Sequence, residues 1–352
     1  MSEFISPHTK LFRHMDRLEA IQQGRIQAPI NIEIDLSNRC SLGCEWCHFA
    51  YTHTRGRLIG KQAKPEGAIP GGDLMDYWLA VNIIEELESI GVRSITWTGG
   101  GEPTMHPDFN HIISFTKIDQ GVYTNGTNID KERAAILKQK CKWVYISLDE
   151  PTQESYKKHK GADMFTKVCL AIIDLVNAKG NATIGVGFLI NKDNWKEAHN
   201  MIELGKKLGV DYVQFRPTIL FDPAQPNKPA EELYWLDEAI AYLDSLRGIP
   251  GLIVDLDRFR AYRDWQGHDY PICYWSGIQA VITPNGKVWI CVNKREYPGA
   301  ELGDLNNEQF IDIWKRRKIV EVDKDCRLMC RGYPVNRMLN ELMRPNEHGN
   351  FI

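Results

Sequence analysis

The chain has 352 residues, of which 43% are hydrophobic and 25% are charged, and its formal net charge is −3. This balance is that of a globular protein with room for one large domain and a small second one, and it excludes a generally cationic nucleic-acid binder. No stretch approaches the roughly 18 apolar residues of a membrane span and the N-terminus has no signal-peptide core, so we expect a cytoplasmic protein without membrane contacts.

Strand-like and helix-like segments alternate from residue 30 to about residue 247. The alternation predicts parallel strands joined by crossover helices. Six such units fit an α/β fold with a partial (β/α)6 TIM-like barrel, and its site is expected at the C-terminal ends of the strands. The strands are predicted at Asn31–Leu36, Val92–Thr98, Gly121–Thr124, Trp143–Leu148, Thr183–Ile190 and Tyr212–Phe215, and the helices at Asp73–Ser89, Lys131–Lys138, Thr166–Ala178 and Lys196–Leu208.

The pattern changes after residue 220. Three prolines in Phe221–Pro229 are typical of a linker, and one more helix is expected at Glu231–Leu246. Strands at Ile278–Thr283 and Lys287–Val292 flank Pro-Asn-Gly, which is a hairpin signal. We therefore predict an N-terminal extension (1–29), a barrel (30–220), a linker with a bridging helix (221–260), a small hairpin-plus-helix domain (261–335) and a C-terminal tail (336–352).

Three of the nine cysteines lie directly after the first predicted strand. Cys40, Cys44 and Cys47 form Cys-x3-Cys-x2-Cys. In a cytosolic chain, cysteines in this number favour metal binding or catalysis over disulfides. Three thiolates on one short loop can hold three corners of a [4Fe–4S] cluster and leave the fourth iron free for a cofactor. A zinc site is the alternative for this spacing.

Two neighbouring features favour the iron–sulfur interpretation. Trp46 precedes the third cysteine, and the next predicted strand ends in Thr-Gly-Gly-Gly-Glu-Pro over residues 98–103. The glycines Gly99, Gly100 and Gly101 let the backbone approach a ligand closely. The carboxylate of Glu102 can pair with an ammonium group.

From Asn31 to about Arg216 the chain resembles the radical S-adenosylmethionine (SAM) superfamily. The resemblance rests on the cysteine motif, the glycine turn and two further segments, Thr124-Asn125-Gly126-Thr127 and Ile146-Ser147-Leu148-Asp149. It implies a [4Fe–4S] cluster that binds S-adenosyl-L-methionine. It also implies cleavage of SAM to methionine and a 5′-deoxyadenosyl radical that takes a hydrogen atom from the substrate. The electron would come from a small donor of the flavodoxin or ferredoxin type.

The resemblance also implies which residues surround SAM. Ser147 and Asn125 are expected near its ribose and carboxylate. A basic residue about a dozen positions after the serine is expected at the carboxylate, and the candidates are Lys158 and Lys160, although a solvated helix end is the alternative for either. The strand ends contribute Asn191 and Gln214 as further candidates. The predicted cofactor-binding residues are Trp46, Gly99, Gly100, Gly101, Glu102, Asn125, Ser147, Lys158, Lys160 and Asn191.

Four further cysteines lie in the last third of the chain. Cys273 and Cys291 flank Gly286 as Cys-x12-Gly-x4-Cys, and Cys326 and Cys330 follow as Cys-x3-Cys. A structural zinc ribbon is the alternative. Beside a radical SAM core, the arrangement resembles the twitch domain, the shortened SPASM domain, and so implies one auxiliary [4Fe–4S] cluster. The remaining cysteines, Cys141 and Cys169, lie in apolar contexts and are predicted to be core residues.

A basic segment follows the first cysteine motif. Between His48 and Lys64 there are six basic residues and no acid before Glu66. Such a segment favours an anionic substrate, nucleic acid or nucleotide, and a solvated loop is the alternative. The basic residues are His48, His53, Arg55, Arg57, Lys61 and Lys64.

The run from Cys47 to His53 resembles radical SAM proteins encoded by phages, one group of which rearranges glycinylthymidine in DNA. The substrate hypothesis is therefore an amino-acid-modified nucleobase that the protein isomerises. Dehydrogenation, epimerisation or cross-linking of a peptide or small molecule is the alternative. From a different class of protein, the alternative is a non-catalytic zinc-binding module.

Overall fold

The computed structural model describes residues 10–25, 27–49, 73–222, 225–324, 326–345 and 347. Its centre is a ten-stranded, mostly parallel sheet in the order β13-β12-β11-β1-β2-β3-β4-β5-β6-β9. The strands are β1 Asn31–Asp35, β2 Ser94–Thr98, β3 Asp119–Thr124, β4 Trp143–Ile146, β5 Thr183–Ile190, β6 Tyr212–Pro217, β9 Leu252–Val254, β11 Gln279–Ile282, β12 Lys287–Trp289 and β13 Glu301–Asp304.

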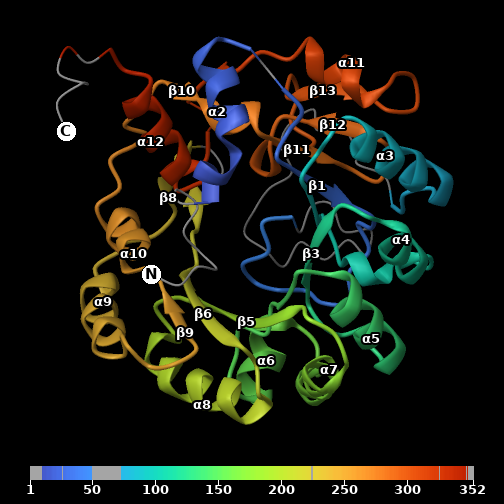
Figure 1. The fold of residues 1–352 in the computed structure, drawn as a ribbon. Helices are drawn as coiled ribbons and strands as arrows, with labels where there is room; N and C mark the ends of the chain where they lie inside the picture. Colours follow the sequence, from blue (N-terminus) through green and yellow to red (C-terminus); the bar gives the residue numbers. More distant parts are fainter. Residues whose placement is uncertain are drawn as a thin grey trace.

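The crossover helices lie around the outside of this curved sheet (Figure 1). Local capping fixes where several begin: the carboxylate of Asp76 accepts from Leu79 N at the start of α3, and that of Asp130 accepts from Arg133 N at the start of α5. The helices are α3 Tyr77–Ser89, α4 Phe109–Phe115, α5 Lys131–Lys140, α6 Gln153–Lys160, α7 Phe165–Asn177, α8 Ala198–Leu208, α9 Trp235–Ser245 and α10 Leu256–Arg263.

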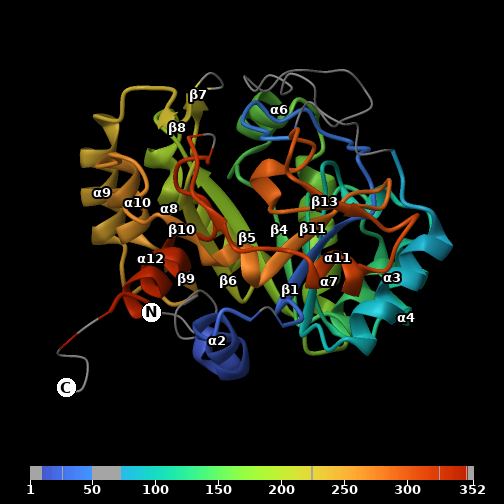
Figure 2. The same cartoon turned by 90° about the horizontal axis from the view of Figure 1, so that it is seen from above.

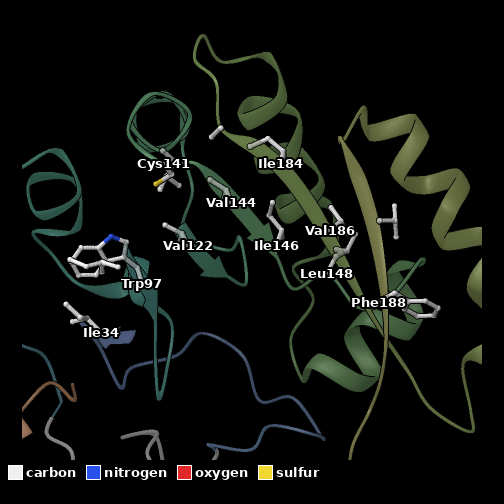
Figure 3. Packing of buried hydrophobic residues seen from close by; sticks show 14 of the residues in the cluster. Ile34, Trp97, Val122, Cys141, Val144, Ile146, Leu148, Ile184, Val186 and Phe188 are labelled. Atoms are coloured by element: carbon white, nitrogen blue, oxygen red, sulfur yellow. The ribbon is translucent and has the colours of Figure 1, made fainter. Parts of the chain in front are cut away.

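The main core lies between the strands and these helices. Apolar side chains from neighbouring strands, among them Trp97, Val144 and Ile184, point toward the helical layer (Figure 3). Cys141 is 5% exposed in this core, and Cys169 packs against it, as predicted. Burial of apolar area on this scale is the main term that stabilises the barrel.

The opposite face of β3–β6 carries a layer of aromatic side chains. Tyr123, Trp143, Tyr145 and Tyr212 pack together there with Ile253 of β9. Glycines make room for the rings. A Cβ on Gly187 would lie 2.1 Å from Tyr145 Oη, and one on Gly121 would lie 1.9 Å from the Trp143 ring. This layer fills the inside of the barrel beneath the site described below.

The C-terminal segment continues the barrel sheet. β11 pairs in parallel with β1, so that Asn31 lies opposite Gln279 and Ile34 opposite Ile282. The predicted hairpin of β11 and β12 therefore extends the sheet at its first strand. α12, Tyr333–Leu342, lies beside the N-terminal helix α2, Met15–Gln22 (Figure 2), and Leu18, Val335 and Leu339 share a small core.

The predicted fold class is confirmed, and the structure adds elements that the sequence did not reveal. A seventh parallel strand, β9, follows α9 within the segment predicted as a linker, and the helix α10 crosses the predicted end of that segment at residue 260. α12 crosses the predicted boundary between the small domain and the tail. Within the described residues, none of the helices combines the length and the apolar character that crossing a lipid bilayer requires.

Candidate active site

A cavity of about 350 Å³ opens at the C-terminal ends of the barrel strands. Parallel strands present their carboxyl ends at one edge, which is where this fold class places its ligands. Most of the predicted site residues converge on it. Its lining includes Cys40, Cys44, Cys47, Trp46, Gly99, Gly100, Gly101, Glu102, Asn125, Ser147 and Lys160.

The cysteine loop is held by backbone and side-chain hydrogen bonds. Gly43 N donates to Lys160 O at 2.9 Å, which ties the loop to the end of α6. The amide of Asn125 donates to Ser41 Oγ at 3.2 Å and lies 3.7 Å from Cys40 Sγ. Burial raises the pKa of Cys40 and of Cys47 to about 12. Free thiols here would stay protonated at neutral pH, and a bound metal centre would favour their thiolate form.

The glycine turn after β2 packs directly against this loop. Gly101 N donates to Ser37 O at 3.2 Å, and Glu102 N donates to Arg39 O at 2.8 Å. A Cβ on Gly101 would lie 2.3 Å from Arg39 O. A side chain at position 101 would therefore displace the cysteine loop, and this steric conflict is the reason that a glycine fits here.

Glu102 lies in the cavity wall, but its carboxylate already has protein partners. Oε1 accepts from Thr104 Oγ1 and Thr124 Oγ1, both at 2.6 Å, and Oε2 accepts from Asn125 N at 2.6 Å. Burial raises the pKa of Glu102, while these hydrogen bonds favour its charged form. In this arrangement the carboxylate fixes the start of the turn that carries Asn125.

The two candidate lysines have different environments. Lys160 is buried, and its Nζ lies 2.5 Å from Asp149 Oδ2, 3.0 Å from Ser147 O and 5.7 Å from the centre of the Trp46 ring. Burial alone would lower the pKa of Lys160, but the charge of Asp149 outweighs it and raises that pKa. Lys158 is exposed on α6 and does not line the cavity. The structure therefore brings only Lys160 of the two to the site.

Asn191 and Gln214 do not line the cavity either. The side chain of Asn191 accepts from Asp193 N at 2.9 Å and so stabilises the turn after β5. On β6 the cavity is lined by Arg216, two residues after Gln214, and by Pro217. Asp149 also lines the cavity and has an unusual positive φ of 59°. Asp149 lies three residues after the end of β4, and the sequence pointed to it only as the last residue of the segment Ile146-Ser147-Leu148-Asp149.

The four distal cysteines line a second cavity, of about 290 Å³, next to the first. Cys330, Arg327 and Arg331 belong to the walls of both cavities. Asn336 Nδ2 lies 3.4 Å from Cys273 Sγ. Burial raises the pKa of Cys326 and of Cys330 to about 12, and a bound metal centre would favour the thiolate form of these cysteines as well.

Both cysteine sets fit iron–sulfur clusters by the chemistry of their donors, because thiolates are the ligands that such clusters require. The sequence profile of the radical SAM superfamily matches residues 34–205, and that of the SPASM iron–sulfur cluster-binding domain matches residues 273–332. The chain is a radical SAM enzyme. The second match spans all four distal cysteines and favours an auxiliary iron–sulfur cluster over the zinc alternative.

Known relatives of this radical SAM enzyme include a PqqA peptide cyclase from Methylocella silvestris. It is 23% identical over 299 residues, which are 82% of this chain and 75% of that protein. A probable GTP 3′,8-cyclase from Saccharolobus solfataricus is 27% identical over 188 residues. That match covers 52% of this chain and only 55% of the relative.

The fold is similar to that of Streptococcus suis SuiB. The TM-score is 0.62 for SuiB bound to S-adenosylmethionine, with 15% identity, and the match covers 91% of this chain and 73% of SuiB. For SuiB bound to its precursor peptide SuiA the TM-score is 0.59, also at 15% identity, over 90% and 71% of the two chains. At this level of identity the similarity describes the fold.

The basic segment predicted at the mouth of the site lies mostly outside the described residues. Only its first member, His48, is described, and it lines the cavity. Burial lowers the pKa of His48 to about 3, and the nearby charge of Arg327 adds to this shift. His48 is therefore neutral at physiological pH and is not one of the positive charges that the segment was expected to supply.

Proposed function

We propose that this enzyme removes a hydrogen atom from an amino-acid unit of a peptide. The observation that carries the proposal is the convergence of three cysteines, the glycine turn, Asn125 and Ser147 on one cavity. S-adenosylmethionine on an iron–sulfur cluster supplies a carbon radical able to abstract hydrogen from an unactivated carbon. The chain's own residues supply binding, orientation and exclusion of water.

In this proposal Cys40, Cys44 and Cys47 hold the SAM cluster. The backbone of Gly99–Gly101 recognises the methionine end of SAM, because these glycines leave their peptide groups open to a ligand. Asn125 and Ser147 contact the polar groups of SAM. Trp46 covers the loop, and Lys160 acts through Asp149 and the Ser147 carbonyl, which it holds in place.

In the same proposal the four distal cysteines, Cys273, Cys291, Cys326 and Cys330, hold the auxiliary cluster. Four protein thiolates would saturate such a cluster, which suits electron transfer better than direct binding of substrate. Because Cys330 lines both cavities, this cluster would lie next to the substrate. A small electron donor would deliver the electron that starts the reaction.

Iron analysis of anaerobically purified variants tests these assignments. We expect about eight irons per chain in the wild type and about four in a Cys40→Ala/Cys44→Ala/Cys47→Ala variant. Replacing the four distal cysteines by alanine should also leave about four. Retention of zinc and almost no iron in the triple variant would contradict the auxiliary iron–sulfur cluster.

The peptide substrate is supported by the relatives, which are named as a peptide cyclase and as a protein bound to a precursor peptide. A second candidate is the glycinylthymidine of phage DNA. One observation in its favour is the set of cationic side chains around the cavity, which suits an anionic substrate. In addition, one relative is named as a probable GTP 3′,8-cyclase.

Product analysis separates the two candidates. Reduced enzyme and SAM would be incubated in parallel with glycinylthymidine-containing DNA and with a pool of acidic and neutral peptides. The peptide proposal predicts a mass change in peptides only. A rearranged nucleoside in the DNA digest, with unchanged peptides, would replace it with the nucleobase function.

A further inference from the structure

Four arginines line the active-site cavity, and among the residues that the structure describes three of them form no ion pair with a carboxylate. Arg331 pairs with Glu33. Among the described residues, no carboxylate lies within ion-pair distance of Arg216, Arg258 or Arg327. The carboxylate of Asp149 interacts electrostatically with Arg216, but it forms its ion pair with Lys160.

Each of the three arginines is held by neutral groups instead. Arg216, on β6, donates to Tyr145 Oη at 2.8 Å, and its guanidinium lies 4.7 Å from the centre of that ring. Arg258, on α10, donates to Met329 O at 3.2 Å. These contacts fix the direction of both side chains without neutralising their charge.

Arg327 is 4% exposed and comes from the turn between the last two cysteines. Its guanidinium lies 4.4 Å from the centre of the Phe221 ring and 3.3 Å from His48 Nδ1. The Nε groups of Arg216, Arg258 and Arg327 are all buried and have no hydrogen-bond partner among the described residues.

The positive charges repel one another inside this site. Burial lowers the pKa of Arg258 to about 10, and the charge of Arg216 adds to the shift. Burying several cations without a counterion costs free energy, and an anion bound between them would reduce that cost. The negative groups that face Arg258 are Asp255 and Cys330, whereas Arg317 is buried beside Cys273 and Cys291. The guanidinium groups of Arg216, Arg258 and Arg327 line the substrate cavity.

We propose that Arg216, Arg258 and Arg327 bind a carboxylate of the substrate, so that the enzyme selects an acidic peptide. The inference rests on the proposed function and deepens it. The three side chains come from β6, α10 and the turn before Cys330, whereas the proposed SAM-binding residues come from the cysteine loop and the ends of β2–β4. We call Arg216, Arg258 and Arg327 the arginine wall. An acidic substrate residue bound to this wall would direct its neighbouring C–H bonds toward the proposed SAM-binding residues.

A matched pair of peptides tests this inference. Binding of Ac-Gly-Glu-Gly-NH2 and Ac-Gly-Gln-Gly-NH2 to reconstituted enzyme with SAM would be measured by anaerobic calorimetry. A charge-assisted hydrogen bond is strong enough for a preference of about tenfold for the glutamate peptide. Arg216→Gln, Arg258→Gln and Arg327→Gln should each reduce the preference to about twofold or less.

Two variants serve as controls. Arg263→Gln removes an exposed arginine from the same helix as Arg258, one that already pairs with Asp237 and Asp264, and should keep the full preference. Arg216→Lys keeps the charge and should keep most of the preference. SAM affinity should stay within about twofold of wild type in all these variants.

Three outcomes would overturn the inference. Equal binding of the two peptides by wild type would remove the carboxylate site. Loss of SAM affinity in the glutamine variants would assign the arginines to the SAM carboxylate. Tighter, arginine-dependent binding of thymidine 5′-monophosphate than of either peptide would assign them to a nucleotide. Release of 5′-deoxyadenosine from SAM, measured in the same samples, reports separately on the proposed radical chemistry.

Discussion

Asp35, at the end of β1, and Arg295, in the segment between β12 and β13, form an ion pair in which neither side chain is exposed to solvent. The guanidinium of Arg295 also lies 4.2 Å from the centre of the Phe49 ring, next to the cysteine loop. The pair therefore joins the first barrel strand, the loop of Cys40, Cys44 and Cys47, and the small C-terminal domain at one buried point.

Removing one partner of this pair should destabilise the protein strongly. Arg295→Gln leaves a buried carboxylate without its cation, which costs about 3–5 kcal/mol. Arg316→Gln is the control, because Arg316 pairs with Glu308 at a position where its side chain is 50% exposed, and exposed pairs contribute about 0–1 kcal/mol. Thermal unfolding of the anaerobic proteins measures both. Equal shifts of the unfolding midpoint would contradict the structural role of Asp35 and Arg295.

The same pair predicts a pH dependence. Burial raises the pKa of Asp35 from 3.8 to about 6, so the folded state binds this proton more tightly than the unfolded state does. The resulting stabilisation is fully present below the unfolded pKa and is lost as pH rises through the folded one. We expect the free energy of unfolding of wild type, relative to Asp35→Asn, to fall by about 1 kcal/mol between pH 5.5 and 8. A difference that stays flat or rises would be inconsistent with a raised pKa.

Lys160 and Lys158 form a matched test on one helix. Lys160→Met should leave Asp149 buried without its cation, lower the free energy of unfolding by about 3 kcal/mol or more, and weaken SAM binding. Lys158→Met changes an exposed side chain and should have an effect within about 0.5 kcal/mol. Thermal unfolding and SAM titration report on both. If Lys158→Met impaired SAM binding more than Lys160→Met, the arrangement of the site would be wrong.

Sequence reasoning could find both lysines but could not choose between them. They are two positions apart, and residues with that spacing lie on nearly opposite sides of a helix. Only the packing of α6 against the cysteine loop decides which one is buried. The six barrel strands and both cysteine sets were predictable because each is encoded in a local pattern of spacing.

The parts that were missed depend on contacts between distant segments. The pairing of Asn31 with Gln279 joins strands almost 250 positions apart, and nothing in either local pattern specifies it. The arginine wall likewise combines Arg216, Arg258 and Arg327 from three separate segments. The local sequence around each of them does not distinguish it from an ordinary surface arginine. β9 has only three residues, too few for a periodic signal.

Glu102→Gln tests the proposed positioning role of this carboxylate. The new amide group would face donors from Thr104, Thr124 or Asn125, whose hydrogen bonds now converge on the two carboxylate oxygens. Leaving buried donors unpaired costs about 1–3 kcal/mol each. We expect SAM affinity to fall by about tenfold or more, with the iron content unchanged. Unchanged SAM affinity would show that the turn at Asn125 does not depend on Glu102.

The central claim is that Cys40, Cys44 and Cys47 build a SAM-cleaving centre in the barrel cavity. Its most direct test is the release of 5′-deoxyadenosine from SAM by reconstituted, dithionite-reduced enzyme in the presence and absence of acidic peptide. We predict release by the wild type and by Lys158→Met, and none by the triple alanine variant although it keeps its distal iron. No release by fully reconstituted wild type under either condition, or equal release by the triple variant, would contradict the claim.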